Sequence, residues 1–330
     1  MGARTFVKSY RHTHMYITPL VCLQTTRPEI YKSTYKNKMD INKVLYNCST
    51  FILKLTQIIM KLFRLQLHDL MQLRDRKYVD ILHHSEHFLV VSKPYDMYIN
   101  SNNPEKKNTL QSELKKILPN LANPNLFHEF HFVHRLDYAT SGVICIALNK
   151  KAARAASSAF EARTAKKFYL ALLHGHINEP YLIIDKAIGI DVREKTGNHK
   201  MCISDNIFCE KPRKSYTVLV VLEQGLRNGK PATKVLLCPG TGRRHQLRVH
   251  CSHIGHTVVG DYTYSERKDV EPYRTFLHSF RLILNNDIEN LDVKSIDPFQ
   301  ASDPRNQWSP TNIARVLDEN IFSDIYDLMQ

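Results

Sequence analysis

Short apolar runs separated by polar stretches dominate the chain from residue 78 onward. Runs rich in β-branched and aromatic residues that end at Gly, Pro, Asn or charged residues are typical of strands. The mixture of such runs with a few helical segments predicts an α+β fold. We expect strands over residues 88–92, 132–134, 143–148, 168–173, 215–222 and 235–237.

Three segments predict helices instead. The alanine-rich segment 151–163 follows Asn149, which is a suitable N-cap residue. Near the end of the chain, Ser309 and Pro310 resemble an N-cap and a first-turn proline, and they predict a C-terminal helix through Leu317. Residues 51–73 predict a basic amphipathic helix, in which the longest run without a charge is too short to cross a bilayer.

This pattern divides the chain into three expected parts. Residues 1–77 form a basic N-terminal extension, which we expect to be partly disordered around the amphipathic helix. Residues 78–300 form the main domain, and residues 301–330 form a helical tail packed on it. A chain of 330 residues with 43% hydrophobic content can bury a substantial core.

Charge is concentrated at the N-terminus. Residues 1–77 hold 14 Lys and Arg against 4 Asp and Glu, which is most of the net charge of +14. Such an excess favours non-specific binding to a polyanion. Seven scattered cysteines indicate reduced thiols, and no secretory signal is evident. We therefore expect an intracellular, cytoplasmic protein, with mitochondrial targeting through the extension as the alternative.

Residues 134–143, HRLDYATSGV, place a carboxylate and a guanidinium in a loop between two predicted strands. Loops held by strands often carry catalytic groups, and Arg135 and Asp137 lie in such a loop. The alternative is structural, because Asp137 and Ser141 could simply bond the backbone of a turn.

A second motif, PGTGRRHQLRVH at residues 239–250, combines a glycine turn with a basic cluster. The glycines allow the backbone to approach a ligand closely. The spacing of Arg244, Gln246 and Arg248 predicts the start of a helix, whose N-terminal amides suit an anion such as phosphate. Taken alone, Arg243 or Arg244 would be interpreted as a solvated surface charge.

Together these segments resemble the HRLDxxTSG and TGRxHQLRxH motifs of pseudouridine synthases of the large-subunit type, and both motifs are complete here. A third segment, KKFYLALLHG at residues 166–175, resembles the KxYxAxxxG strand of that family. The resemblance extends over most of the chain, from Ile81 to Pro310.

The resemblance implies an RNA pseudouridine synthase. The implied fold is a large mixed, mostly antiparallel sheet bent around a catalytic cleft, with flanking helices. Asp137 is implied as the essential carboxylate on the cleft floor, Arg248 as its paired arginine and Tyr169 as the tyrosine that stacks on uracil. Arg135 is implied to lie near the flipped base. The other residues expected to bind RNA or substrate are Thr140, Ser141, Gly142, Thr241, Gly242, Arg243 and His245.

The implied reaction breaks the N1–C1′ bond of uridine, turns the base and rejoins it through C5. No redox step occurs, so we expect no cofactor. A carboxylate can start the reaction as a nucleophile or as a base. We therefore expect Asp137 to attack or deprotonate the flipped nucleotide.

One segment departs from the family pattern. A lysine-proline pair is commonly followed by a small residue and a glycine, whereas this chain has Lys93, Pro94, Tyr95 and Asp96. Without the glycine we expect the loop to take a different path.

Two alternatives from other classes remain open. The first is a catalytically idle RNA-binding protein of the same fold. The second is a metal-dependent hydrolase built on His245, His250, His253 and His256, but no paired Cys-x-x-Cys accompanies them and Gly255 interrupts their spacing. We expect no metal, no membrane association, a monomer, and ribosomal, transfer or messenger RNA as the partner.

Overall fold

The computed structural model describes residues 78–103, 105–193 and 200–329, together with residue 56. Residues Lys77–Gln330 form one compact unit. The helix expected over residues 51–73 falls outside the described residues except at residue 56, so it stays a prediction. No described helix combines the length and the apolar character needed to cross a membrane.

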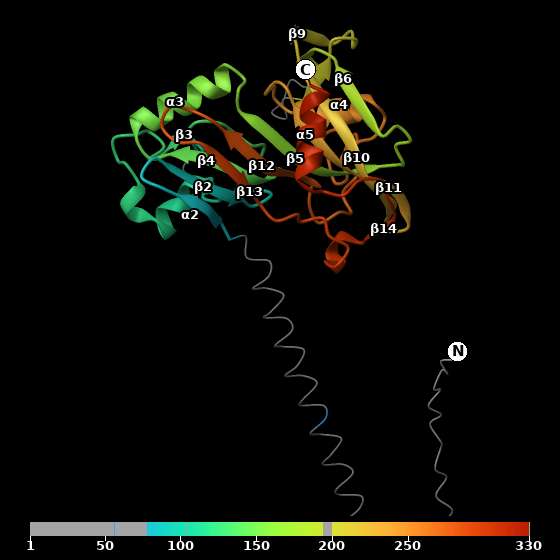
Figure 1. The fold of residues 1–330 in the computed structure, drawn as a ribbon, viewed down its shortest axis with the longest axis horizontal. Coiled ribbons are helices and arrows are strands. Elements are labelled where there is room, and N and C mark those ends of the chain that lie inside the picture. Colours follow the sequence, from blue (N-terminus) through green and yellow to red (C-terminus); the bar gives the residue numbers. More distant parts are fainter. Residues whose placement is uncertain (1–55, 57–77, 104, 194–199, 330) are drawn as a thin grey trace, which may run out of the picture. The chain divides into compact units, whose positions relative to one another are not determined.

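Among the described residues, an 11-stranded sheet forms the framework of the compact unit (Figure 1). All its strand pairs are antiparallel except β4 with β12, which confirms the expected mixed, mostly antiparallel sheet. In spatial order its strands are β1 (Asp80–His84), β2 (Phe88–Lys93), β4 (Ser141–Ala147), β12 (Leu277–Leu284), β5 (Lys166–His174), β11 (Lys230–Pro239), β10 (Tyr216–Arg227) and β14 (Trp308–Ile313), with β3 (His131–Phe132) beside β4, β6 (Tyr181–Asp185) beside β10 and β13 (Leu291–Lys294) beside β12.

A second, three-stranded sheet has the order β8 (Met201–Ile203), β7 (Ile188–Asp191) and β9 (Cys209–Arg213). The helices in the described part of the chain are α2 (Leu110–Ile117), α3 (Lys150–Glu161), α4 (Gln246–His253) and α5 (Glu319–Asp327), with short 3-10 turns at Pro119–Leu121 and Pro304–Asn306. All six strands expected from the sequence are present, although the second is reduced to β3.

Helices cover both faces of the main sheet, because alternate residues of each strand point to opposite sides. At the β2 and β4 end, α3 packs on one face and α2 packs on the other. At the β10 and β11 end, α5 and α4 divide the two faces in the same way (Figure 1). Tyr169 of β5 contacts the apolar clusters that contain α2 and α4, so its ring lies on the sheet face that these two helices share.

The helix expected after Asn149 is confirmed. The Asn149 side chain accepts a hydrogen bond of 2.9 Å from the backbone amide of Ala152, which satisfies a donor that the first turn leaves free. Ala152, Ala156 and Ala159 then face β2 and β4. The small alanine side chains let the helix pack close to the sheet.

The helix expected from Ser309 to Leu317 is wrong, because the segment through Ile313 lies in strand β14 at the edge of the sheet and the rest of it is not helical. Ser309 and Pro310 pair with Leu226 and Gly225 of β10. An edge strand tolerates proline, which has no amide hydrogen for a ladder. The C-terminal helix α5 starts later, where the side chain of Asp318 accepts hydrogen bonds from two first-turn amides. The tail therefore combines a strand with a helix, and sheet pairing outweighs the local helix signal.

The loop after Lys93 bends at Tyr95 and Asp96 without the family glycine. Asp96 stands where the glycine would be, and it adopts a left-handed backbone with φ of 51°, a conformation that Asp tolerates better than most residues. The buried Lys93 ammonium donates to the carbonyls of Pro94, Met97 and Tyr138. These bonds fix this loop against the loop that carries Asp137.

Candidate active site

Two cavities border the loop between β3 and β4, where Asp137 lies. The first has a volume of about 1000 Å³ and the second about 580 Å³. Because Asp137 lines both, a ligand entering either cavity can reach its carboxylate. The residues shared by the two linings are His134, Arg135, Leu136, Asp137, Arg244, His245 and Arg248.

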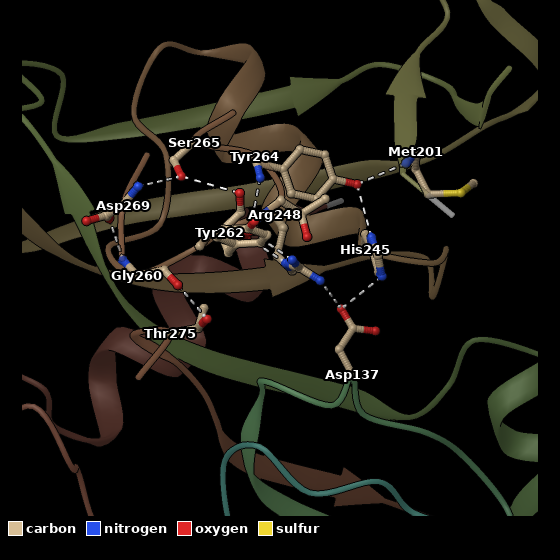
Figure 2. A network of polar contacts seen from close by, with 12 residues as sticks. Asp137, Met201, His245, Arg248, Gly260, Tyr262, Tyr264, Ser265, Asp269 and Thr275 are labelled. Carbon is tan, nitrogen blue, oxygen red and sulfur yellow. Dashed lines mark hydrogen bonds and ion pairs between the residues drawn. The ribbon is translucent and has the colours of Figure 1, made fainter. Parts of the chain in front are cut away.

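The Asp137 carboxylate faces two side chains from the second motif (Figure 2). Arg248 Nη1 donates to Asp137 Oδ2 at 3.3 Å, and His245 Nε2 lies 3.9 Å from the same oxygen. The backbone carbonyl of Asp137 accepts from the amide of Thr140 at 3.2 Å, which closes the turn. The structure thus brings together the carboxylate and the arginine that the motifs predicted as a pair.

A second carboxylate, Asp261, holds Arg248 more tightly. Its two oxygens accept from Nε and Nη2 of Arg248 at 2.6 and 2.8 Å. Asp261 is fully buried, and its Oδ1 also accepts from the amides of Thr263 and Tyr264. Burial would lower the pKa of Arg248, but the hydrogen bonds and charge of Asp261 raise it above its usual value. Arg248 is therefore a fixed cation with one nitrogen directed at Asp137.

His245 is a neutral neighbour of the carboxylate. It precedes α4 in a left-handed conformation with φ of 53°, and its Nδ1 lies 3.1 Å from the Tyr264 hydroxyl. Burial lowers the pKa of His245 to about 4, against the attraction of Asp137. Near neutral pH the His245 imidazole carries no charge. The positive charge next to the Asp137 carboxylate therefore comes from Arg248 and not from His245.

Because His245 is buried as a neutral group, we expect the protein to lose stability in weak acid. Above pH 6.5 both folded and unfolded chains keep this imidazole neutral; between 6.5 and about 4 only the unfolded chain binds the proton, so stability falls as the pH falls. We expect His245 to contribute about 2 kcal/mol to this loss at pH 5. His245→Asn, which suits the left-handed backbone, should show a correspondingly smaller loss in melts at pH 7.5 and pH 5. Equal losses in both proteins would refute this.

Tyr169 lies on β5 and lines the second cavity, as do Leu247 and Leu277. Burial raises the pKa of Tyr169 to about 12, although a hydrogen bond with Ser279 lowers it, and the nearby charge of Asp137 adds to the rise. The phenol therefore stays protonated at neutral pH. An aromatic ring with one hydroxyl, on the lining of a cavity, suits contact with a pyrimidine ring.

Some of the predicted binding residues are built into the framework instead. Ser141 is buried and bonds His278 at 2.6 Å, and it also accepts from Arg274. Gly142 has φ of 106°, and a Cβ there would lie 2.1 Å from the carbonyl oxygen of Ser279. Neither residue lines either of these two cavities. Both hold the start of β4 against β12, which fixes the Asp137 loop.

The remaining predicted binding residues line the second cavity to different extents. Thr140 and Thr241 are nearly buried, and Thr241 donates to Gln246 at 2.6 Å. Gly242 is exposed, whereas Arg243 is partly buried and donates from Nε to the carbonyl of Lys214 at 3.2 Å. The glycine turn thus forms part of the cavity wall, and the bond between Thr241 and Gln246 stabilises this turn.

Arg135 and Arg244 supply the positive charge at the junction of the cavities. Arg135 is exposed, and its charge adds to burial in lowering the pKa of Arg244. Among the described residues, the buried Nε of Arg244 has no hydrogen-bond partner. An unsatisfied buried donor is unfavourable.

The four histidines weighed as metal ligands do not gather at one point. His250 is buried between Thr217 and the carbonyl of Lys186, and His256 bonds the carbonyl of His174. Within residues 78–103, 105–193 and 200–329 no group of three or more His, Cys, Asp and Glu side chains has a geometry that could hold a metal.

Two residues of the site were missed from the sequence, Asp261 and Tyr264, and Arg244 was considered only as part of the basic cluster. Asp261 follows Gly260 in a segment without a charged neighbour, and a buried arginine requires a carboxylate partner, which is the signal that could have identified it. The Tyr264 ring lies 5.1 Å from the Arg248 guanidinium, and its hydroxyl accepts from the amide of Met201 (Figure 2). Nothing in the local sequence predicts that contact.

The chain is similar in sequence and in fold to several known proteins. The model of the RNA pseudouridylate synthase family matches residues 87–253. RNA pseudouridylate synthase domain-containing protein 1 of Homo sapiens is 47% identical over 244 residues, covering 73% of this chain and 77% of the human protein. Dual-specificity RNA pseudouridine synthase RluA of Pasteurella multocida is 33% identical and covers 64% of this chain and 89% of that protein. The solved structure of human RNA pseudouridylate synthase domain containing 1 superposes with a TM-score of 0.67 at 42% identity, covering 76% of this chain and 95% of that chain.

Proposed function

This chain belongs to the RNA pseudouridylate synthase family and is an RNA pseudouridine synthase, and we propose that Asp137 starts its reaction on a uridine turned out of the RNA. The observation that carries this proposal is the chain of contacts from Asp261 through Arg248 to Asp137 at the junction of two cavities. It places one carboxylate beside a fixed cation where a nucleotide can reach it.

The reaction balances without an added reactant. Breaking the N1–C1′ bond leaves the electron pair on the uracil, the base turns, and C5 forms the new bond to C1′. The proton that C5 loses is replaced by one gained at N1, so the product is an isomer of the substrate. Asp137 can act as a nucleophile on the sugar or base, or remove a sugar proton. Arg248 holds this carboxylate in position through its hydrogen bond.

Tyr169 is proposed to hold the uracil and to assist the proton transfer. Its ring forms one wall of the second cavity, and Leu277 lies on the same lining. A phenol with a pKa of about 12 is a hydrogen-bond donor at neutral pH. It can therefore donate to a uracil oxygen while the base turns.

Arg135 is proposed to occupy the space that the flipped uridine vacates, since it is exposed and lines both cavities. Arg135→Ala should lower kcat/KM by about 100-fold and weaken RNA binding, because unstacking a base costs a few kcal/mol. Arg135→Lys keeps the charge but not the planar group, so it should recover binding more than turnover. Normal turnover of Arg135→Ala in single-turnover assays would exclude this role.

RNA is the proposed partner, held in part by Arg244, which lines both cavities and whose guanidinium can donate to a phosphate. We further propose that residues 78–300 with the C-terminal tail suffice for catalysis as a monomer inside the cell. The N-terminal extension would add salt-dependent affinity, because a basic segment releases counterions from RNA when it binds.

Pseudouridine mapping tests the proposed function. Total RNA from cells that lack the protein would be mapped after rescue with the intact chain or with Asp137→Asn. Sites that vanish without the protein and return only with the intact chain would establish the activity and identify the RNA. Equal rescue by both chains would favour an RNA-binding protein that does not use its catalytic residues.

A further inference from the structure

We propose that Tyr98 and Tyr138 form a platform that stacks an unpaired base next to the target uridine. The proposal rests on the proposed function, and it names the kind of RNA that the site accepts. We call this pair the tyrosine platform.

The tyrosine platform lies in the first cavity, whereas the proposed position of the target base, on Tyr169, lies in the second. Tyr169 lines the second cavity only, whereas Tyr98 and Tyr138 line the first cavity only. Asp137 borders both and directly precedes Tyr138 in the chain. A uridine placed on Tyr169 therefore leaves a space of about 1000 Å³ for its neighbours along the strand.

The two rings are in contact and remain open to solvent. Their centroids are 4.6 Å apart with an interplanar angle of 46°, and the residues are 38% and 43% exposed. Two exposed aromatic rings on the lining of a cavity that also holds Asp137 offer a surface for a flat ligand. Stacking on such rings is the common way in which proteins bind unpaired bases, because every base has a π-face.

Rigid backbone supports both rings. The carbonyl of Tyr138 accepts from the amide of Met97 at 3.1 Å and from buried Lys93 at 3.2 Å. The carbonyl of Tyr98 accepts from the amide of Leu110 at 2.7 Å, at the start of α2. Binding a base would therefore order little of the protein, which favours affinity.

Cations near the tyrosine platform suit an RNA backbone. The Lys106 ammonium lies 4.5 Å from the centroid of the Tyr98 ring and is exposed. Arg135 and Arg244 lie on the same cavity lining, toward Asp137. A strand that crosses from one group of cations to the other would pass its bases over the tyrosines. Bases inside a helix are already stacked, so this arrangement selects a loop, bulge or single strand.

The tyrosine platform can be tested in the full chain by combining protein variants with two matched RNA probes, one of which lacks the stacked base. The probe is a short single-stranded oligouridine with one 2-aminopurine beside the central uridine, and a matched probe has an abasic site there. Tyr138→Leu and Tyr98→Leu should each weaken binding of the first probe by about tenfold and reduce quenching of its fluorescence. Neither should change binding of the abasic probe, because no base is left to stack.

Two matched variants complete the design. Tyr138→Phe keeps the ring and should bind like the intact chain. Tyr181→Leu removes a tyrosine of similar exposure, 42%, that lines neither cavity, and it should have no effect. Equal losses with both probes, or unchanged binding by Tyr138→Leu, would overturn the platform. Absence of pseudouridine formation by the intact chain, with the base-specific loss preserved, would overturn the proposed function and leave the platform standing.

Discussion

Replacing Asp137 with asparagine is expected to reduce pseudouridine formation by about four orders of magnitude or more, because the amide can neither attack the nucleotide nor remove a proton. The fold should survive the change. Asp137 makes one 3.3 Å bond to Arg248, while Asp261 keeps the two shorter ones. We therefore expect the free energy of unfolding to change by less than about 1 kcal/mol. Single-turnover assays on a mapped substrate RNA and thermal melts provide the two measurements.

Asp96 offers a matched control for that experiment. Its carboxylate lines the first cavity too, and its left-handed backbone suits asparagine equally well. Asp96→Asn should slow turnover by less than about tenfold, since it removes a charge but not the reacting group. RNA binding by Asp137→Asn should stay close to that of the intact chain. Comparable losses from both variants would indicate that general charge in the cavity, rather than Asp137 itself, governs the rate.

Removing the charge of Asp261 should produce the largest loss of stability. Asp261→Asn can still accept from the amides of Thr263 and Tyr264, so the change isolates the ion pair with Arg248. A buried guanidinium that loses its main carboxylate typically costs about 4 kcal/mol of folding free energy. Arg248 would then turn toward Asp137, and we expect turnover to fall by about 100-fold as well. Denaturant unfolding and single-turnover assays would measure the two effects.

A double variant separates stability from catalysis. Arg248→Met with Asp261→Asn removes both charges, and such a replacement of a buried pair is often close to neutral. We expect most of the stability to return while turnover stays low, because Asp137 no longer has a cation beside it. If turnover returned together with stability, Arg248 would be a structural residue and not a partner of Asp137.

Local patterns predicted the parts of the fold that depend on local interactions. Asn149 is followed by alanines, and the cap and helix are present because both effects act within a few residues. Ser309 and Pro310 also predicted a helix from local features, and that prediction was wrong. Their strand depends on pairing with Leu226 and Gly225, more than 80 residues earlier. No feature of the segment itself reveals that partner.

The residues of the candidate site also divide into those that the sequence predicted and those that it did not. Asp137 and Arg248 were expected to form a pair because both stand in complete motifs, and their 3.3 Å contact is present. Asp261 was missed because its role depends on burial beside a guanidinium 13 positions away. Ser141 and Gly142 were expected to touch substrate since they share a motif with Asp137. They fix the strand that carries the loop, which shows that a motif can combine chemistry with support.

The position of β12 has a consequence for biosynthesis. This strand comes late in the chain, yet it lies between β4 and β5 and is the parallel partner of β4. The Asp137 loop and the Tyr169 strand are therefore joined only after Leu284 has left the ribosome. Contacts between such distant segments slow folding, because the loops between them must close first. We expect nascent chains that end before residue 277 to expose the edges of both strands and to need chaperone protection until the central strand arrives.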